Sequence, residues 1–172
     1  MRLLLLRHAK AEKGGPGVDD RDRALNPRGR TDAARIGAYM AHHGLLPGGA
    51  LVSPARRTRE TFERLTSAWP APCPVRYVDR LYNAGLDAIV EAIKGASPQV
   101  LLVVGHNPGL HDLAIALIAS GDTTARERVN NKLPTSGLVV IDLPFDNWSR
   151  LKAKAGRLER FVSPRLLETA TD

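Results

Sequence analysis

Three short polar segments of the sequence combine residue types that can bind and transfer a phosphoryl group. They are "RHA" at residues 7–9, "SPARR" at residues 53–57 and "GHNPG" at residues 105–109. A guanidinium forms paired hydrogen bonds with phosphate oxygens and stays charged at every working pH. A neutral imidazole that is oriented by a hydrogen bond at one nitrogen can attack phosphorus with the other. The candidate residues for this chemistry are Arg7, His8, Arg57 and His106.

The dipeptide Arg7-His8 is weak evidence for a site by itself, because a chain with 19 Arg and 5 His among 172 residues can contain such a pair by chance. Its weight comes from its position directly after the apolar run of residues 3–6. The other two segments also follow apolar runs. The recurrence of this arrangement, rather than any one motif, indicates a common site.

Short apolar runs alternate with amphipathic stretches along the chain. The expected strands are residues 2–6, 50–52, 75–78, 100–104, 138–143 and 158–162. The expected helices begin near Pro27, Leu86 and Leu110, and they end near Gly44, Gly95 and Gly121. This alternation predicts an α/β fold, a three-layer α/β/α sandwich with a mostly parallel central sheet.

The fold class predicts where the three segments meet. Ligands of open α/β sheets bind at the carboxyl ends of the parallel strands, and each segment follows such a strand. Ser53-Pro54 and Asn107-Pro108 also have the pattern of an N-cap followed by a first-turn proline. Helix N-termini attract anions through free N–H groups and the helix dipole. The sequence therefore predicts a phosphate site at this edge of the sheet.

Length and composition favour a single domain over residues 1–172, with residues 163–172 as a possible loosely ordered tail. The hydrophobic content is 43%, which is enough for one core. One cysteine cannot form an internal disulfide, which suits a reducing compartment. The apolar run of residues 3–6 is shorter than the ~7–15 residues of a signal peptide core, and no stretch approaches the ~20 residues of a membrane span. We expect a cytoplasmic protein without a membrane partner.

The net charge of +7 raises the alternative of nucleic-acid binding, since Lys and Arg neutralise phosphates. However, Arg outnumbers Lys 19 to 6 in an alanine-rich chain, a bias that a GC-rich genome produces without selection for binding. Aromatic residues make up only 5% and are not interleaved with the basic ones, so stacking platforms for bases are not expected. We therefore expect no nucleic-acid partner.

The motifs together resemble the histidine phosphatase superfamily, which includes the phosphoglycerate mutases. The segments that carry the resemblance are "RHA", "SPARRTRET" and "GHNP". The similarity is greatest to the small SixA-type phosphohistidine phosphatases, through "RALNPRG", "GHNPGL" and "LPTSGL", and it extends to "ERFVSPRLL". The resemblance implies a phosphoglycerate mutase-like fold and a metal-independent phosphatase that acts through a phosphohistidine intermediate, with phosphohistidine proteins as the expected substrates.

The resemblance also implies roles for individual residues. His8 matches the nucleophile, Arg7 and Arg57 match the phosphate ligands, and His106 matches the second histidine of the pocket. Arg23, in the stretch before the first helix, is a further candidate phosphate ligand. No cofactor and no metal ion is expected.

The chain departs from the family pattern at two places. Ala9 stands where the family has Gly, which is tolerated only if that residue has a negative φ. Larger members carry a Glu that protonates the leaving group, whereas "DRLYNAG" offers Asn83 and no aligned carboxylate. Asp79 is near in sequence but has no assigned role. The identity of a general acid stays open.

Several alternatives remain open on the sequence. The substrate could be a phosphorylated protein or a small phosphorylated molecule, and the pocket could bind phosphate without turnover. A mutase is disfavoured, because the short chain has no insertion to enclose an intermediate. Residues 150–160, which place Arg150, Lys152 and Lys154 on one side of an alternating pattern, could form a solvated strand face, a charged edge that prevents strand pairing, or a docking surface for an acidic protein. His42, His43 and His111 are expected to have structural roles, and neither the oligomeric state nor the pathway is predicted.

Overall fold

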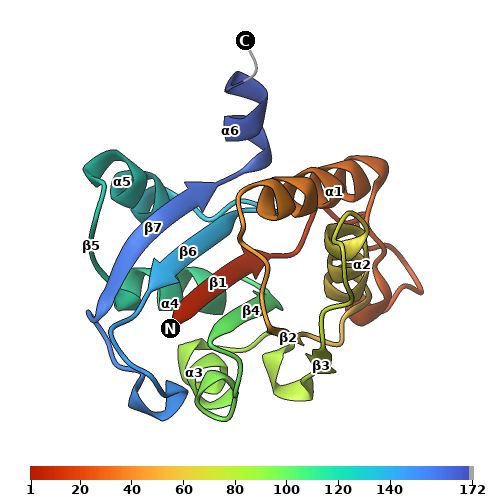
Figure 1. Ribbon diagram of the computed structural model, residues 1–172. Coiled ribbons are helices and arrows are strands. Elements are labelled where there is room, and N and C mark those ends of the chain that lie inside the picture. Colours follow the sequence, from red (N-terminus) through yellow and green to blue (C-terminus); the bar gives the residue numbers. More distant parts are fainter. Residues whose placement is uncertain (171–172) are drawn as a thin grey trace.

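A seven-stranded sheet forms the centre of the molecule, and the computed structural model describes residues 1–170 (Figure 1). The strands are β1 (Arg2–Arg7), β2 (Gly49–Val52), β3 (Val75–Tyr77), β4 (Val100–Gly105), β5 (Ile118–Gly121), β6 (Leu138–Asp142) and β7 (Gly156–Val162). Their order across the sheet is β3-β2-β4-β1-β6-β7-β5. Only β6 pairs antiparallel with its neighbours, so the prediction of a mostly parallel sheet is confirmed.

Helices cover both faces of this sheet, as an α/β/α sandwich requires (Figure 1). They are α1 (Pro27–His42), α2 (Arg56–Thr66), α3 (Leu86–Lys94), α4 (Gly109–Leu117), α5 (Thr123–Asn131) and α6 (Pro164–Thr169). Short 3-10 helices are η1 (Asp20–Asp22), η2 (Asp79–Leu81) and η3 (Trp148–Arg150). Helices α1 and α2 share one hydrophobic core, and α3 and α4 share the other with part of α5.

Strand β1 shows why the sequence forms a central strand. Leu3 and Leu5 lie in the core under α3 and α4, whereas Leu4 and Leu6 lie in the core under α1 and α2. All four side chains have no exposed surface, because successive strand residues point to opposite faces and helices cover both of them. A continuous apolar run followed by Arg7 is therefore the pattern of a buried strand that ends at a polar edge.

Two glycines allow neighbouring elements of the fold to approach closely. A Cβ atom on Gly37 of α1 would lie 1.9 Å from the backbone oxygen of Leu65 of α2. A Cβ atom on Gly109, the first residue of α4, would lie 2.0 Å from the backbone oxygen of Ala84. Such distances are far shorter than any van der Waals contact, so a side chain at either position would push these elements apart.

Three regions differ from the predictions made from the sequence. Strand β5 and helix α5 were not expected, because β5 is short and its pairing with β7 joins segments far apart in the chain. Residues 150–154 are not a strand face, since β7 begins only at Gly156. Lys154 is exposed, and its ammonium group donates to the backbone oxygens of Ile115 and Ile118 at the end of α4.

The C-terminal stretch of residues 163–172, for which the sequence suggests a loosely ordered tail, contains α6. Ser163 is the N-cap of this helix, where its hydroxyl oxygen accepts a hydrogen bond from the N–H of Leu166. Pro164 occupies the first turn, which favours helix initiation. Residues 171–172 lie outside the described residues.

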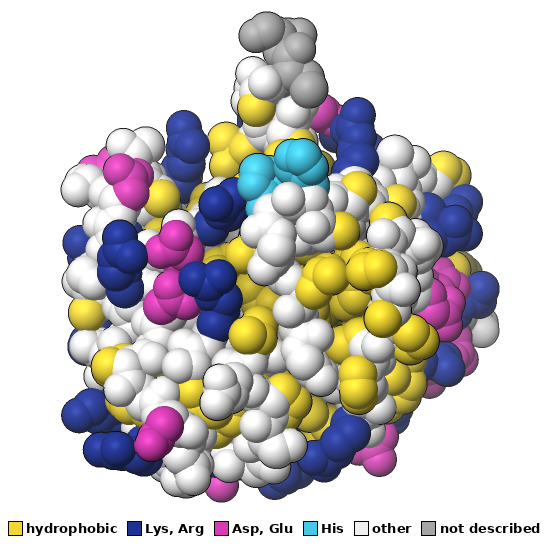
Figure 2. All heavy atoms as spheres, viewed as in Figure 1, with side chains coloured by type: hydrophobic (Ala, Val, Ile, Leu, Met, Phe, Trp, Pro, Cys, Tyr) yellow, Lys and Arg dark blue, Asp and Glu magenta, His cyan; other side chains and the backbone are white. Residues whose placement is uncertain are grey.

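The surface of the face seen in Figure 1 carries both signs of charge. Dark blue and magenta side chains are interspersed around the periphery of this face, with hydrophobic side chains between them (Figure 2). Within residues 1–170, no helix has the length and apolar character needed to span a membrane.

Candidate active site

The register of the central strands brings the two predicted site histidines together. Arg7 of β1 is aligned with Gly105 of β4, and the N–H of His8 donates to the Gly105 oxygen at 3.1 Å. Each histidine directly follows the last residue of its strand, Arg7 in β1 and Gly105 in β4. The imidazole rings of His8 and His106 consequently lie with their centroids 5.3 Å apart.

His8 is held in one tautomer by the residue that follows it. Its Nδ1 lies 2.7 Å from the backbone oxygen of Ala9, and a carbonyl oxygen can only accept a hydrogen bond. Nδ1 therefore carries the proton, which leaves a lone pair on Nε2. Ala9 is fixed in turn, because its N–H donates to Thr61 Oγ1 at 2.9 Å. Ala9 is not among the described residues with positive φ, so the methyl group in place of the family's Gly is tolerated.

His106 has both ring nitrogens engaged. Its Nε2 lies 2.7 Å from Ser53 Oγ, and its Nδ1 lies 3.3 Å from Nη2 of Arg57. Since a guanidinium can only donate, Nδ1 is the acceptor and Nε2 carries the proton that is donated to Ser53. Ser53 is not the N-cap of α2, contrary to the sequence prediction. The helix begins at Arg56 after Ala55, because the serine hydroxyl is turned into the site.

The two predicted phosphate ligands are buried arginines with unused hydrogen-bonding capacity. Arg57 in the first turn of α2 is only 3% exposed, and Arg7 is half-buried at the end of β1. The guanidinium of Arg7 donates from Nη1 to the backbone oxygen of Leu133 at 3.1 Å. The Nε atoms of both arginines are buried without a hydrogen-bond partner in the described chain. Unpaired buried cationic donors are costly, and both arginines lie close enough to His8 to lower its pKa, which indicates an anionic ligand at this place.

The remaining buried polar atoms without a partner among the described residues are Asn107 Oδ1 and Ser136 Oγ. Asn107 follows His106, and the Ser136 N–H donates to the backbone oxygens of Arg7 and His8. Asn107 was predicted to cap α4, but that helix begins at Gly109 after Pro108, and the Asn107 amide donates to the Leu133 oxygen. The polar atoms that lack partners thus belong to segments that adjoin the two histidines.

The surroundings of the two imidazoles keep both neutral at pH 7. Burial lowers the pKa of His8 to about 4, and the positive charges of Arg57 and Arg7 lower it further. Burial also lowers the pKa of His106 to about 3, with His8 and Arg57 adding to the shift. A neutral His8 with a lone pair on Nε2 is the protonation state that a nucleophile needs.

Arg23, the fifth predicted site residue, forms its hydrogen bonds with nearby residues of the loop before α1. Its Nε lies 3.0 Å from Asp20 Oδ1, and its Nη1 donates to the backbone oxygen of Glu12. Its charge nevertheless contributes to the lowered pKa of His8. Arg23 therefore lies near the site, but in this structure it is paired with Asp20.

Asp20 and Tyr82 are site neighbours that the sequence reasoning missed. Asp20 Oδ2 lies 3.2 Å from Nη2 of Arg57 and accepts a hydrogen bond from the Tyr82 hydroxyl. The ring of Tyr82 stands edge-on to that of His106, with centroids 5.7 Å apart. The only sequence signal for Asp20 is its place in the acidic and basic run "DDRDR" near Arg23.

The carboxylate at the site does not come from the segment in which the family pattern would place it. Asp79, the nearest candidate by sequence, is exposed at the first residue of η2, and Asn83 is exposed with a φ of 49°. Instead, the loop before α1 supplies Asp20. This difference arises because a contact of 37 residues' separation, between Asp20 and Arg57, is invisible to local sequence patterns.

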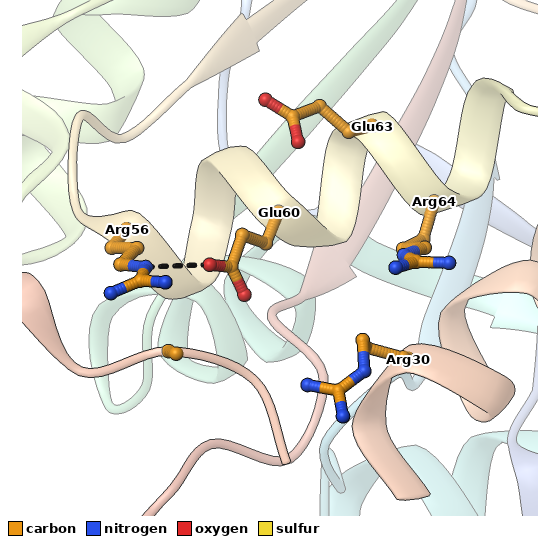
Figure 3. A pocket seen from close by; sticks show the side chains of 6 residues that line it. Arg30, Arg56, Glu60, Glu63 and Arg64 are labelled. Atoms are coloured by element: carbon orange, nitrogen blue, oxygen red, sulfur yellow. Dashed lines mark hydrogen bonds and ion pairs between the residues drawn. The ribbon is translucent and has the colours of Figure 1, made fainter. Parts of the chain in front are cut away.

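A charged groove of about 300 Å³ lies beside the site, between the start of α1 and α2 (Figure 3). Figure 3 shows Arg56 turned toward Glu60, and their side chains are joined by an ion pair of 2.6 Å. The other carboxylate oxygen of Glu60 accepts from the N–H of Leu25 at 2.8 Å. This groove is therefore structural in character, because Glu60 ties the loop that carries Asp20 and Arg23 to α2.

The other histidines have structural contacts. His111 lies with Nε2 at 2.6 Å from the Val129 oxygen, and His42 and His43 end α1, where the His43 ring packs on Tyr39. Within residues 1–170, no group of three or more His, Cys, Asp or Glu side chains is placed to hold a metal ion.

Comparison with known proteins identifies the family. Residues 3–92 match the profile of the histidine phosphatase superfamily, branch 1. The chain belongs to the histidine phosphatase superfamily. An uncharacterised protein of Mycobacterium leprae is 36% identical over 166 residues, which cover 93% of this chain and 100% of the relative. The resemblance noted in the sequence is thereby confirmed.

Solved structures of superfamily members share the fold. A candidate phosphohistidine phosphatase SixA of Agrobacterium tumefaciens superposes with a TM-score of 0.81 at 32% identity, covering 95% of this chain and 97% of the other. A second such protein, of Nakamurella multipartita, has a TM-score of 0.78 at 28% identity and 95% coverage of both chains. A protein histidine phosphatase SixA complexed with tungstate has a TM-score of 0.76 at 19% identity, covering 97% of this chain and 99% of the other, which shows the fold alone.

Proposed function

We propose that this protein is a metal-independent phosphatase that acts through a phosphohistidine intermediate on His8 and removes phosphate from phosphohistidine side chains of proteins. The observation that carries the proposal is the state of His8. Its Nδ1–H is held by the Ala9 oxygen, which leaves Nε2 free to attack, and the ring lies 5.3 Å from that of His106. The superfamily and the SixA-type structural relatives support the same reaction class.

Positive charge for the transferred phosphoryl group comes from the side chains themselves. Arg7 and Arg57 each present a buried Nε–H without a partner among the described residues. Phosphoryl transfer is catalysed mainly by positioning and by stabilising charge on the three equatorial oxygens. Two fixed guanidiniums can do both, and His106, which is bonded to Ser53 and to Arg57, helps to position the Arg57 guanidinium. Water then attacks phosphorus and releases inorganic phosphate.

The test is a single-turnover labelling experiment combined with a substrate panel. Brief exposure to a phosphohistidine peptide labelled on phosphorus, followed by denaturation, is expected to leave an acid-labile, alkali-stable label on His8. The panel compares kcat/KM for phosphohistidine, an aryl phosphate and an alkyl phosphate at one pH. The expected order is phosphohistidine first, the aryl phosphate second and the alkyl phosphate last.

Other outcomes separate the alternatives. Turnover of an alkyl phosphate as fast as phosphohistidine would indicate a small-molecule phosphomonoesterase with a general acid. Binding of phosphate without turnover of any substrate would indicate a phosphate-binding module. Turnover without label on His8 would contradict the covalent mechanism.

A further inference from the structure

Asp20 lies at the exposed rim of the candidate site, next to the buried Arg57. Its side chain is 48% exposed, whereas that of Arg57, to which it is paired, is 4% exposed. The N–H groups of Arg57 reach Asp20 twice, at the backbone oxygen from Nη1 at 2.8 Å and at Oδ2 from Nη2 at 3.2 Å. The same Nη2 also reaches His106. Asp20 is thus attached to the outer side of the group that is expected to bind phosphate.

The leaving group of a protein substrate has to occupy this rim. An in-line displacement places the attacking and leaving atoms on opposite sides of phosphorus. With His8 as the nucleophile, the departing group lies on the side of phosphorus opposite His8, and the rest of a partner protein must extend from it into solvent. Asp20 and Tyr82 are the polar side chains that the structure joins to Arg57 on this outer side.

The Asp20 carboxylate retains capacity to accept a hydrogen bond. Oδ2 accepts from Tyr82 and from Arg57, while Oδ1 accepts from Arg23 alone among the described residues. Each carboxylate oxygen can accept two hydrogen bonds, so Oδ1 has one acceptor position left. The hydrogen bond from Tyr82, with the charges of Arg57 and Arg23, lowers the pKa of Asp20 to about 2. The group is therefore an anion at working pH and has no proton to give to an alkoxide.

We propose that Asp20 is a specificity-determining residue that accepts a hydrogen bond from the ring N–H of the departing imidazole, and so favours phosphohistidine over phosphate esters. This inference rests on the proposed function and names the leaving group that the site selects. A cationic or N–H-bearing ring is attracted to the carboxylate, whereas the oxygen of an alkyl phosphate is not. Asp20 is expected to change the reaction rate through its contact with the leaving group, and not through the phosphoryl group that all substrates share.

The reaction balances without an added proton. The Nε2 lone pair of His8 forms the new N–P bond, and the substrate's P–N bond breaks with its electron pair going to the imidazole nitrogen. The other substrate nitrogen keeps its proton, held by Asp20, so a neutral imidazole departs. His8 becomes phosphorylated with Nδ1–H still donated to the Ala9 oxygen. Water then adds to phosphorus, both of its protons leave with dihydrogen phosphate, and neutral His8 is restored.

The same contact predicts a pH effect that is specific to phosphohistidine. An imidazole nitrogen has an ordinary pKa of ~6.5, and an adjacent anion favours its protonated form. Loss of the carboxylate is expected to move the alkaline limb of kcat/KM for phosphohistidine about one unit lower. The charged and titratable groups around Asp20 are Arg57 of α2, Tyr82 after η2, His106 after β4, and Arg21 and Arg23 of its own loop. None of these residues is substituted in the variant tested.

The experiment compares wild type with Asp20→Asn and Asp22→Asn on a phosphohistidine peptide and on 4-nitrophenyl phosphate. Asp22 is the matched control, because it is exposed in the same short helix and, within the described chain, makes no side-chain contact with Arg57 or Tyr82. The ratio of kcat/KM for the peptide to that for the aryl phosphate is expected to fall about tenfold in Asp20→Asn, the effect of one hydrogen bond to a charged group, and to stay constant in Asp22→Asn.

The outcomes are distinguishable from a failure of the proposed function. An equal fall on both substrates in Asp20→Asn, with an unshifted alkaline limb, would mean that Asp20 only holds Arg57 in place and would overturn the inference. Failure of the wild type to hydrolyse the phosphohistidine peptide would instead contradict the proposed function. Tyr82→Phe provides a second variant, expected to lower the same ratio by a smaller factor because it removes the hydrogen bond that positions Asp20.

Discussion

The ends of β1 and β4 carry the same residue type in different surroundings. At the end of β1, His8 has one nitrogen held by the Ala9 oxygen, and its other nitrogen has no protein partner among the described residues. At the end of β4, His106 has one nitrogen held by Ser53 and the other by Arg57. The difference teaches that hydrogen bonding, rather than residue type, determines which of two neutral imidazoles keeps a lone pair available for attack, and we therefore expect His8, not His106, to be the nucleophile.

The two ends also differ in what they connect. Next to His8, the Arg7 guanidinium donates to the Leu133 oxygen. Next to His106, Arg57 is paired with Asp20, and the Tyr82 ring contacts the imidazole. We therefore expect the β1 end to determine whether transfer occurs and the β4 end to determine how the phosphoryl and leaving groups are oriented. The following predictions test that division.

Loss of the nucleophile is expected to have the largest effect. His8→Ala should lower kcat by about 10⁴-fold or more and abolish the phosphohistidine label, because no other group can form the intermediate. His106→Ala should lower kcat by about 10²–10³-fold but keep the label on His8. The measurement is single-turnover labelling, with exposed His42→Ala as control. A label found on His106 would reverse the assignment.

Arg57→Ala is expected to lower kcat/KM by about 10²–10³-fold, since it removes a buried positive charge and the one guanidinium donor, Nε–H, that has no partner among the described residues. Its neighbour supplies a matched control, because Arg56 is exposed and paired with Glu60. Arg56→Ala should change kcat/KM by less than about twofold, as expected for a surface ion pair. Similar losses in both variants would show that the arginine at the Ser-x-x-x-Arg spacing has no special role.

Ser53→Ala is expected to act through His106. The substitution removes the acceptor of the buried Nε2–H, which should cost about 1–3 kcal/mol of stability and about tenfold in kcat. Urea denaturation and steady-state kinetics measure the two effects. Thr66→Ala removes an exposed hydroxyl that bonds within α2 and serves as the control. A loss of stability without any change in kcat would indicate that the orientation of His106 is unimportant.

The pH dependence of stability follows from the two lowered histidine pKa values, about 4 for His8 and about 3 for His106. The unfolded chain takes up these protons near pH ~6.5, whereas the folded chain resists them. This stability is therefore fully present above pH ~6.5 and is lost as the pH falls toward 4. Urea denaturation at pH 7, 6 and 5 should show a shallower decline for His106→Asn than for wild type. Identical slopes would contradict the buried neutral state of His106.

Chelation is expected to have the smallest effect. EDTA should leave kcat/KM unchanged, because Arg7 and Arg57 supply the positive charge, while vanadate should compete with substrate for the same donors. Activity measured with and without chelator tests this. If chelation abolished activity and a divalent ion restored it, the two histidines would act as metal ligands. The expected difference in role between His8 and His106 would then be wrong.

The sequence predicted the fold class and the meeting of the site residues because both depend on local signals. The run of Leu3 to Leu6 specifies a strand buried on both faces, and Arg7 directly after it specifies a strand end. The alternation with helices then aligns the ends of β1, β2 and β4. Strand β5 could not be predicted in the same way, because it is short and defined by pairing with β7.

The capping predictions failed for a different reason. Ser53 and Asn107 have the residue types and the following prolines of N-caps, but neither caps its helix. Ser53 binds His106, which lies 53 residues away, and Asn107 binds the Leu133 oxygen, which lies 26 residues away. Ser53 Oγ also accepts a hydrogen bond from the Ala55 N–H, but that residue precedes the helix. Asn107 donates through its amide nitrogen, and its Oδ1, the atom that would cap a helix, has no partner among the described residues.

By itself, the sequence determined a mostly parallel sheet with Arg7, His8, Arg57 and His106 at one edge. Both features depend on neighbouring residues, since the spacing of apolar residues defines the elements and the polar residues that follow them define the strand ends. Only the tertiary structure decided that Asp20, and not Asp79, reaches the site, and that Tyr82 holds it there. It also decided that Nε2 of His8 lacks a protein partner among the described residues, whereas both ring nitrogens of His106 are hydrogen-bonded. These outcomes depend on hydrogen bonds between distant segments, whose geometry is fixed only when the sheet and its helices are packed together.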